Sequence, residues 1–212
     1  MNPSPQPPPS GTGFEPGASL TAMADELEAT HHAYLRAVLP ELHNRAVMVA
    51  DTHAAHHPEL APLAALIREL RAELEPHLAK EEQVLFPFAR LLDGAEAMPR
   101  FNCGSIRNPI GAMLADHDRT DELLARLRAA TAGFTAHADA PVGVHHLYRD
   151  LAELEADTLA HIHKENHGLF PAAMAAERAL LERQAASAGP DQGGDPACWA
   201  HRFGPFDHEP EP

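Results

Sequence analysis

The sequence is poor in cysteine and in aromatic residues. It has only two cysteines in 212 residues, Cys103 and Cys198, and they lie far apart. This excludes a disulfide framework and favours a reducing compartment, so we expect a cytoplasmic protein. Aromatic residues make up 5% of the chain, whereas alanine and leucine abound and β-branched residues are scarce. That composition favours helices over strands and predicts an all-α protein.

The sequence also lacks a long hydrophobic run and an excess of basic residues. No apolar stretch approaches the length of a membrane span, and the N-terminus has no basic region followed by an apolar block. The 16 Lys and Arg residues face 31 Asp and Glu residues, which gives a formal net charge of −15. Such a surface repels a phosphate backbone. We therefore expect neither a membrane nor a nucleic acid as a partner.

Proline, glycine and acidic residues gather at the two ends of the chain. Residues 1–18 are rich in Pro, Gly and Ser and are expected to be a disordered lead. Residues 187–212 are rich in Gly, Pro and acid and are expected to be an irregular tail, which Trp199, Phe203 and Phe206 could dock onto the domain. Residues 19–186 remain as one folded domain.

Within that domain, apolar residues recur at spacings of three and four, which predicts four long helices. Short loops between them make an up-down-up-down four-helix bundle the natural packing. Pro40 is expected to break or kink the first helix. The other boundary signals are Ser19 as a cap, Pro58 in a first turn, Gly94 as a stop, Asn108 with Pro109 as a cap and first-turn proline, Gly133 near a stop, and Pro141 with Gly143 in a loop.

Histidine is abundant, with 16 residues, and some of it lies in a repeated pattern. Residues 77–87 read HLAKEEQVLFP and residues 161–171 read HIHKENHGLFP, which share the skeleton His-x-x-x-Glu-x-x-x-x-Phe-Pro. His32 precedes His77 by 45 residues, and His117 precedes His161 by 44. The chain is therefore expected to contain two copies of a helical hairpin, each with three candidate metal ligands.

The spacing of the repeated pattern predicts a buried metal centre. Residues i and i+4 share one face of a helix, so His77 and Glu81 point the same way. Both lie on the apolar stripe, where an uncompensated carboxylate costs several kcal/mol or more. A cation is the simplest compensation, and four histidines with two bridging glutamates suit two iron ions. A single histidine or a single His-x-x-x-Glu is usually structural, but the matched pair on two core stripes favours metal.

Some positions near the expected centre stay open. Periodicity does not decide between His31 and His32 on the first helix. Glu73 and Asp157 lie four residues before His77 and His161, where they either orient the imidazoles or form a solvated flank. His53 could approach the site. By default the remaining histidines, like His53, are expected at the surface or in the tail: His43, His56, His57, His137, His145, His146, His163, His167, His201 and His208.

Pro76 stands directly before the candidate ligand His77. A proline inside a helix removes one hydrogen bond and disfavours helical backbone at the preceding residue. We expect a kink at this point, which would shift His77.

Four stretches together resemble the hemerythrin-like Repair of Iron Centres family: HHAYLRAVLPEL, HLAKEEQVLFP, CGSIRNPIGAMLADHD and HIHKENHGLFP. They span roughly residues 28–178. The resemblance implies a four-helix bundle with an oxo-bridged di-iron centre, and it selects His32 over His31. The implied metal ligands are His32, His77, Glu81, His117, His161 and Glu165.

The same resemblance implies repair of iron–sulfur clusters damaged by nitric oxide or peroxide. Iron donation to clusters and reduction of nitric oxide to nitrous oxide are the implied chemistries, with nitric oxide, O₂ and damaged iron–sulfur proteins as partners. Fuller members of the family begin with a small domain bearing a cysteine pair, whereas here a Pro-rich lead stands there and no cysteine precedes Cys103. The resemblance therefore does not extend to a handover of electrons or iron through that pair.

Two other functions fit the sequence. The first is a module that binds or senses O₂ or nitric oxide without turnover. Oxygen carriers of the hemerythrin type usually use five histidines, and His31 or His53 could supply the fifth. The second is a metal-free helical scaffold, which is disfavoured because two buried glutamates would each need neutralising.

Overall fold

The computed structural model describes residues 7, 13–100 and 104–187, and in these residues it contains helices and no strand. The expected all-α class is confirmed. Cys103, Cys198, Trp199, Phe203 and Phe206 lie outside the described residues, as does most of the two predicted tails. Within the described part, no helix is both long and apolar enough to cross a membrane.

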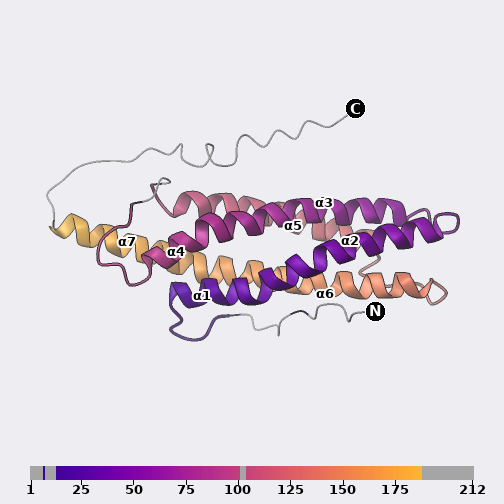
Figure 1. Cartoon of the computed structure of the whole chain (residues 1–212), viewed down its shortest axis with the longest axis horizontal. Helices are drawn as coiled ribbons and strands as arrows, with labels where there is room; N and C mark the ends of the chain where they lie inside the picture. The colour runs from indigo at the N-terminus through magenta and orange to yellow at the C-terminus, as the bar shows by residue number, and fades with distance from the viewer. Residues whose placement is uncertain (1–6, 8–12, 101–103, 188–212) are drawn as a thin grey trace, which may run out of the picture.

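The helices join into four rods, which we number in chain order (Figure 1). Rods 1, 2 and 4 each contain a π-helical turn between two α-helices, whereas rod 3 is one α-helix. Rod 1 is α1 (Leu20–Leu27), η1 (Glu28–His32) and α2 (Ala33–His53); rod 2 is α3 (Leu60–Lys80), η2 (Glu81–Leu85) and α4 (Phe86–Leu92); rod 3 is α5 (Arg107–Ala130); rod 4 is α6 (Val142–Lys164), η3 (Glu165–Leu169) and α7 (Phe170–Ser187).

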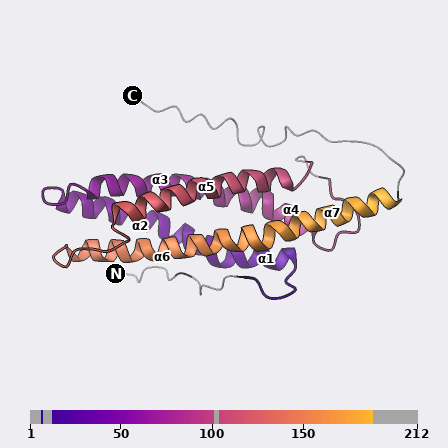
Figure 2. The same cartoon turned by 180° about the vertical axis from the view of Figure 1, so that it is seen from behind.

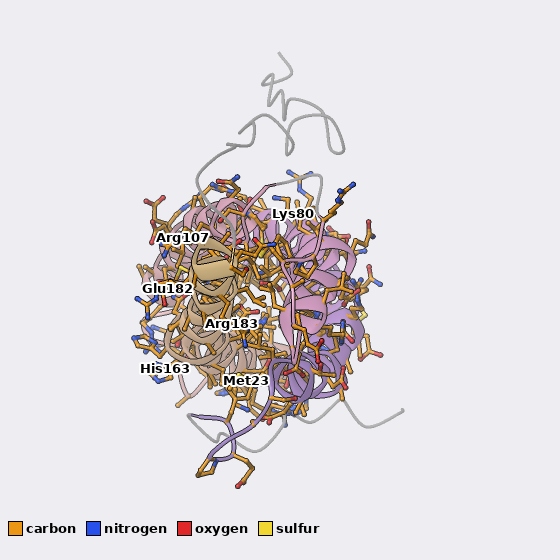
Figure 3. All side chains as sticks on the ribbon, turned by 90° about the vertical axis from the view of Figure 1, so that its left-hand side faces the viewer. Met23, Lys80, Arg107, His163, Glu182 and Arg183 are labelled. Atoms are coloured by element: carbon orange, nitrogen blue, oxygen red, sulfur yellow. The ribbon has the colours of Figure 1, made fainter. Side chains whose placement is uncertain are left out.

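Successive rods run in opposite directions, as expected for an up-down-up-down bundle (Figures 1 and 2). Helix α2 packs on α3 and α6, α3 also packs on α5, and α4 packs on α1 and α7. The four rods therefore enclose one long core. Helix α7 extends past the other helices at one end of the bundle, and Figure 3 views the molecule from that end.

The core consists of two apolar clusters with a polar layer between them. One cluster includes Leu35, Ile67 and Leu151, and the other includes Leu27 and Phe86, all at most 1% exposed. Burying each such side chain stabilises the fold by roughly 1.5–3 kcal/mol. In every rod, the buried histidines fall where one cluster gives way to the other, whereas the buried acids Asp150 and Glu177 lie within the stretches that form the clusters. The apolar layers on both sides therefore fix the position of this polar layer.

Several expected helix boundaries are confirmed. Ser19 caps α1, and its Oγ accepts a hydrogen bond from the N–H of Ala22 at 3.2 Å. Gly94 follows α4 with a φ of 67°, a left-handed conformation that favours glycine.

The expected cap at Asn108 is wrong by two residues. Helix α5 begins at Arg107, so Asn108 and Pro109 already lie in its first turn. The start is capped instead by Ser105, whose Oγ accepts from the N–H of Arg107 at 3.2 Å, and by Glu177 from rod 4, which accepts from the N–H of Ile106 at 2.8 Å. Gly143 likewise lies inside α6 rather than in the loop before it.

The prolines inside the rods do not end helices. Helix α2 continues through Pro40, and α3 continues through Pro76 to Lys80. Pro40 therefore does not break its helix, and a kink at Pro40 or Pro76 stays a prediction. Pro76 leaves the buried His77 in the polar layer. Packing of both helices on their neighbours offsets the hydrogen bond that each proline lacks. Pro58 lies in the turn before α3 rather than in its first helical turn.

Candidate metal centre

The polar layer contains two overlapping groups of possible metal ligands. One group is His32, Glu81, His161 and Glu165; the other is His77, Glu81, His117 and Glu165. Within each group, one ligand atom from each residue lies within 4.8 Å of the others. Glu81 and Glu165 belong to both groups. The six residues that the family resemblance singled out therefore meet at one place, and all four rods contribute.

The ligand atoms of this layer are buried and lack hydrogen-bond partners. Glu81 and Glu165 are 0% exposed, and neither oxygen of either carboxylate has a hydrogen-bond partner among the described residues. The Nε2 atoms of His32, His117 and His161 are orphaned in the same way. Buried polar atoms normally have a hydrogen-bond partner, so this many buried atoms without one in a single layer indicate that a bound partner is missing.

The distances between these atoms suit a pair of cations. Nε2 of His32 and Nε2 of His77 each lie 3.3 Å from Oε2 of Glu81. On the opposite side, Nε2 of His117 and Nε2 of His161 lie 3.2 Å from the Glu165 carboxylate. Imidazole nitrogens and carboxylate oxygens are ligands of first-row metals, and cations among them would satisfy the orphaned atoms. The residues present therefore fit a di-metal site.

The pKa values of the metal-free layer also indicate that it would accommodate cations. Burial and the neighbouring Glu165 carboxylate raise the pKa of Glu81 to about 8. Burial favours a raised pKa for Glu165 too, but His161 and His117 hold its pKa well below the usual range. His161 would have a lowered pKa from burial, yet the two glutamates raise its pKa to about 9. Without metal, the layer therefore retains protons in place of cations.

Three π-helical turns place site residues. His32 ends η1, whereas Glu81 begins η2 and Glu165 begins η3. Pro87 and Pro171 follow η2 and η3, and a proline has no N–H with which to continue the α-helical hydrogen-bond pattern. Such wide turns are frequent at functional sites. These π-helical turns were not predicted from the sequence, although the repeated Phe-Pro pair was the signal.

The phenylalanines of the two Phe-Pro pairs cover the histidines of rods 1 and 3. The ring of Phe86 lies 5.2 Å from that of His32, between centroids. Phe170 stacks on His117 with centroids 5.8 Å apart and planes 6° apart. Both phenylalanines are at most 1% exposed. They close the layer on the side of α4 and α7 with apolar surface.

Two polar residues outside the candidate ligand groups orient His32 and His117. Nδ1 of His32 lies 2.9 Å from Glu82, and Nδ1 of His117 lies 3.0 Å from Asn166. Such partners fix which ring nitrogen faces a metal. Each follows a shared glutamate directly in sequence, and sequence analysis did not identify either one.

The two acids that could either orient His77 and His161 or form a solvated flank contact other residues. Glu73 accepts a hydrogen bond from Arg119 at 2.9 Å, and the acid beside Nδ1 of His77 is Asp116, at 3.5 Å. Burial favours a raised pKa for Asp116, but His77 and Lys80 lower its pKa to about 2. Glu73 therefore does not orient His77, because a cation on the neighbouring rod reaches it, and its side chain is partly exposed.

Asp157 also has an unexpected partner, since Oδ1 lies 2.7 Å from Nδ1 of His31 rather than on His161. His31 is 1% exposed and lies parallel to His161, with ring centroids 5.6 Å apart. It is therefore beside the centre, although it belongs to neither group of candidate ligands.

His53 does not approach the centre. It is the last residue of α2, and the 21 residues from His32 correspond to roughly 30 Å along a helix axis. Its ring contacts His57 instead. The surface histidines are exposed or half-buried as expected, apart from His201 and His208, which lie outside the described residues: His43, His53, His56, His57, His137, His145, His146, His163 and His167.

Comparison with known proteins agrees with this geometry. The model of the hemerythrin HHE cation binding domain matches residues 23–173. The chain belongs to this family. It is also 35% identical over 159 residues to the iron-sulfur cluster repair protein YtfE of Enterobacter sp. (strain 638), which covers 75% of this chain and 68% of the relative. The YtfE protein of Escherichia coli O157:H7 is 34% identical over 160 residues, covering 76% of this chain and 69% of the relative.

Proposed function

We propose that the chain binds two iron ions in the polar layer. His32 and His161 would hold one ion, His77 and His117 would hold the other, and Glu81 and Glu165 would bridge them. The observation that carries this proposal is that both glutamates belong to both groups of candidate ligands. A carboxylate has two oxygens, so it can bind one ion with each.

The ligand set also leaves room for chemistry. Two histidines and two bridging carboxylates supply four donor atoms to each ion, whereas iron commonly takes five or six. Open positions remain for a small molecule. Phe86 and Phe170 exclude water from one side of the layer, which strengthens electrostatic interactions inside it. The protein residues therefore supply position, charge and a dry environment.

We propose that this centre acts in the repair of iron–sulfur clusters under nitrosative or oxidative stress, with damaged iron–sulfur proteins as partners. The names of the relatives, which are iron-sulfur cluster repair proteins, support this role. When bound, two ferrous ions would supply the two electrons that, with two protons, convert two nitric oxide molecules into nitrous oxide and water. The buried layer favours such a small substrate. A cytoplasmic location stays a prediction.

Metal analysis of the protein purified from iron-replete cells tests the proposal. We expect two irons per chain and an absorption spectrum of a non-haem di-iron protein. Protein that is colourless and free of iron would contradict it, and stoichiometric zinc or manganese in its place would replace iron in the assignment.

A module that binds O₂ or nitric oxide without turnover is the second candidate. It is favoured by His31, a fifth buried imidazole beside the centre. Anaerobic reduction followed by O₂ separates the two functions. A spectral change that reverses when O₂ is removed supports the binding module, whereas rapid irreversible oxidation supports repair or reduction.

A further inference from the structure

The two halves of the chain differ at three matched positions around the centre. Residues of rod 1 recur 85 positions later in rod 3, as from 32 to 117, and residues of rod 2 recur 84 positions later in rod 4, as from 81 to 165. By these offsets His31 matches Asp116, Tyr34 matches Arg119, and Glu73 matches Asp157. The matched side chains have different chemistry, so the two ions would have different surroundings.

The side with Asp116 is charged and internally paired. Asp116 accepts a hydrogen bond from Lys80 at 2.9 Å and a second one from Arg119, which also donates to Glu73. Glu73 and Arg119 line a cavity of about 440 Å³ between α3 and α5. The carboxylates on this side thus already have cationic partners within the protein.

The side with His31 contains a buried polar atom that has no hydrogen-bond partner among the described residues. Asp157 holds Nδ1 of His31 at 2.7 Å, so Nε2 on the opposite edge of the ring faces away from Asp157. This Nε2 is that buried atom. Leaving such an atom unsatisfied costs about 1–3 kcal/mol. The ring of His31 stacks on that of His161, with centroids 5.6 Å apart, so His31 lies next to a candidate ligand of the His32/His161 side.

We propose that His31 Nε2 forms a hydrogen bond to a small anionic or diatomic ligand bound on the His32/His161 side of the centre. His31 lies outside both groups of candidate ligands, so it contacts the bound molecule rather than the metal. Because the matched position is an aspartate paired with Lys80, the opposite ion lacks this contact. This proposal rests on the proposed di-metal function and assigns the ion at which a small ligand binds.

Azide binding to the iron-loaded protein tests this role with a pair of substitutions. The amide of Asn reaches about as far as Nδ1, so His31→Asn keeps the bond to Asp157 and removes Nε2. The longer side chain of Gln reaches about as far as Nε2, so His31→Gln keeps a polar atom there. His163→Asn is the matched control, because His163 lies on the exterior of the same rod that carries Asp157 (Figure 3).

We expect all variants to retain two irons. His31→Asn should weaken azide binding, followed by absorption titration, by about 10- to 100-fold, the effect of one hydrogen bond to a charged group. His31→Gln should stay within about threefold of the original protein, and His163→Asn should be unchanged.

Three results would overturn the role of His31 while leaving the di-metal site intact. The first is an azide affinity that is unchanged in His31→Asn, and the second is an affinity that is equally weakened in His31→Asn and His31→Gln. The third is that the original protein holds two irons but binds no detectable azide. Loss of one iron from His31→Asn would make His31 a metal ligand and would also overturn it. Failure of the original protein to bind metal would instead contradict the proposed function.

Discussion

The two halves of the bundle agree where they hold the protein together and differ at residues next to the six candidate metal ligands. In each half, an acid near the end of the second rod caps the start of the first. Asp93 accepts from the N–H of Thr21 at 3.2 Å, and the matched Glu177 accepts from the N–H of Ile106 at 2.8 Å. The same matching relates the two Phe-Pro pairs and the two glutamates of the centre.

The differences gather next to the six candidate ligands. One half presents His31 with Tyr34 and Asp157, and burial together with Asp157 raises the pKa of Tyr34. The other half presents Asp116 with Arg119 and Glu73. A pair of ions that share two carboxylates requires near-symmetric ligands, whereas a small molecule that binds one ion does not. The two halves therefore share the six candidate ligands, whereas the residues that differ are those that we propose to select what binds at the centre.

Removing a shared glutamate should have the largest effect. Glu81→Ala and Glu165→Ala each remove a residue that belongs to both candidate metal groups. We expect the iron content to fall from two per chain to nearly none in both variants, with loss of the absorption bands. Metal analysis after identical purification measures this. The bridging assignment is wrong if either variant keeps two irons and an unchanged spectrum.

Removing the metal should reverse the pH dependence of stability. Glu81 and His161 have pKa values of about 8 and about 9 in the metal-free fold, against 4.5 and 6.5 ordinarily. Between pH 7 and 9 the folded state loses these protons, whereas the unfolded state has already lost nearly all of them, so the free energy of unfolding should fall by roughly 3–4 kcal/mol. Metal binding instead improves as the ligands lose protons.

Thermal unfolding of the two forms across this pH range measures the difference. The melting temperature of the metal-free protein should fall as the pH rises, while the gap between metal-loaded and metal-free protein should widen. If the melting temperature of the metal-free protein stays flat or rises from pH 7 to 9, Glu81 and His161 do not retain protons in the metal-free fold.

The two matched caps should differ in strength. Glu177 is 2% exposed and accepts from both Ile106 N–H and the Ser105 hydroxyl, each at 2.8 Å. Glu177→Ala should lower the free energy of unfolding by about 1–3 kcal/mol, because a buried N–H loses its partner. Asp93→Ala, at a longer and half-buried contact, should cost less than about 1 kcal/mol. Urea denaturation compares them, and equal losses would refute the ranking.

The smallest effect is expected from making the first half resemble the second. Glu82→Asn introduces the residue that stands at the matched position 166, and its amide oxygen can still accept from Nδ1 of His32. It removes the contact with Arg36, which is 44% exposed, so the loss of stability should be below about 1 kcal/mol. Iron content should remain two per chain. A large loss of iron would show that the negative charge of Glu82 is needed.

Sequence periodicity predicted the bundle and the positions of the shared glutamates. His77 and Glu81 lie on an apolar stripe at a spacing that only a helix brings together, and the second copy repeats it. Periodicity could not separate His31 from His32, because the π-helical turn η1 buries both neighbours, each 1% exposed. An α-helix would turn adjacent residues about 100° apart.

The partners of the histidines could not be predicted from the sequence, because they depend on contacts between rods. Asp116 reaches His77 from α5, and Asp157 reaches His31 from α6. Spacing along one helix left open whether Asp157 and Glu73 orient His161 and His77 or form a solvated flank. A long cation on a neighbouring rod, Arg119, reaches Glu73, so Glu73 does not orient His77.

Anomalous diffraction at the iron absorption edge, from crystals of the iron-loaded protein, tests the shared-carboxylate centre most directly. The account predicts two peaks roughly 3.5–4 Å apart, each within bonding distance of both Glu81 and Glu165. A single peak, or a peak bound by only one of the two glutamates, would contradict it.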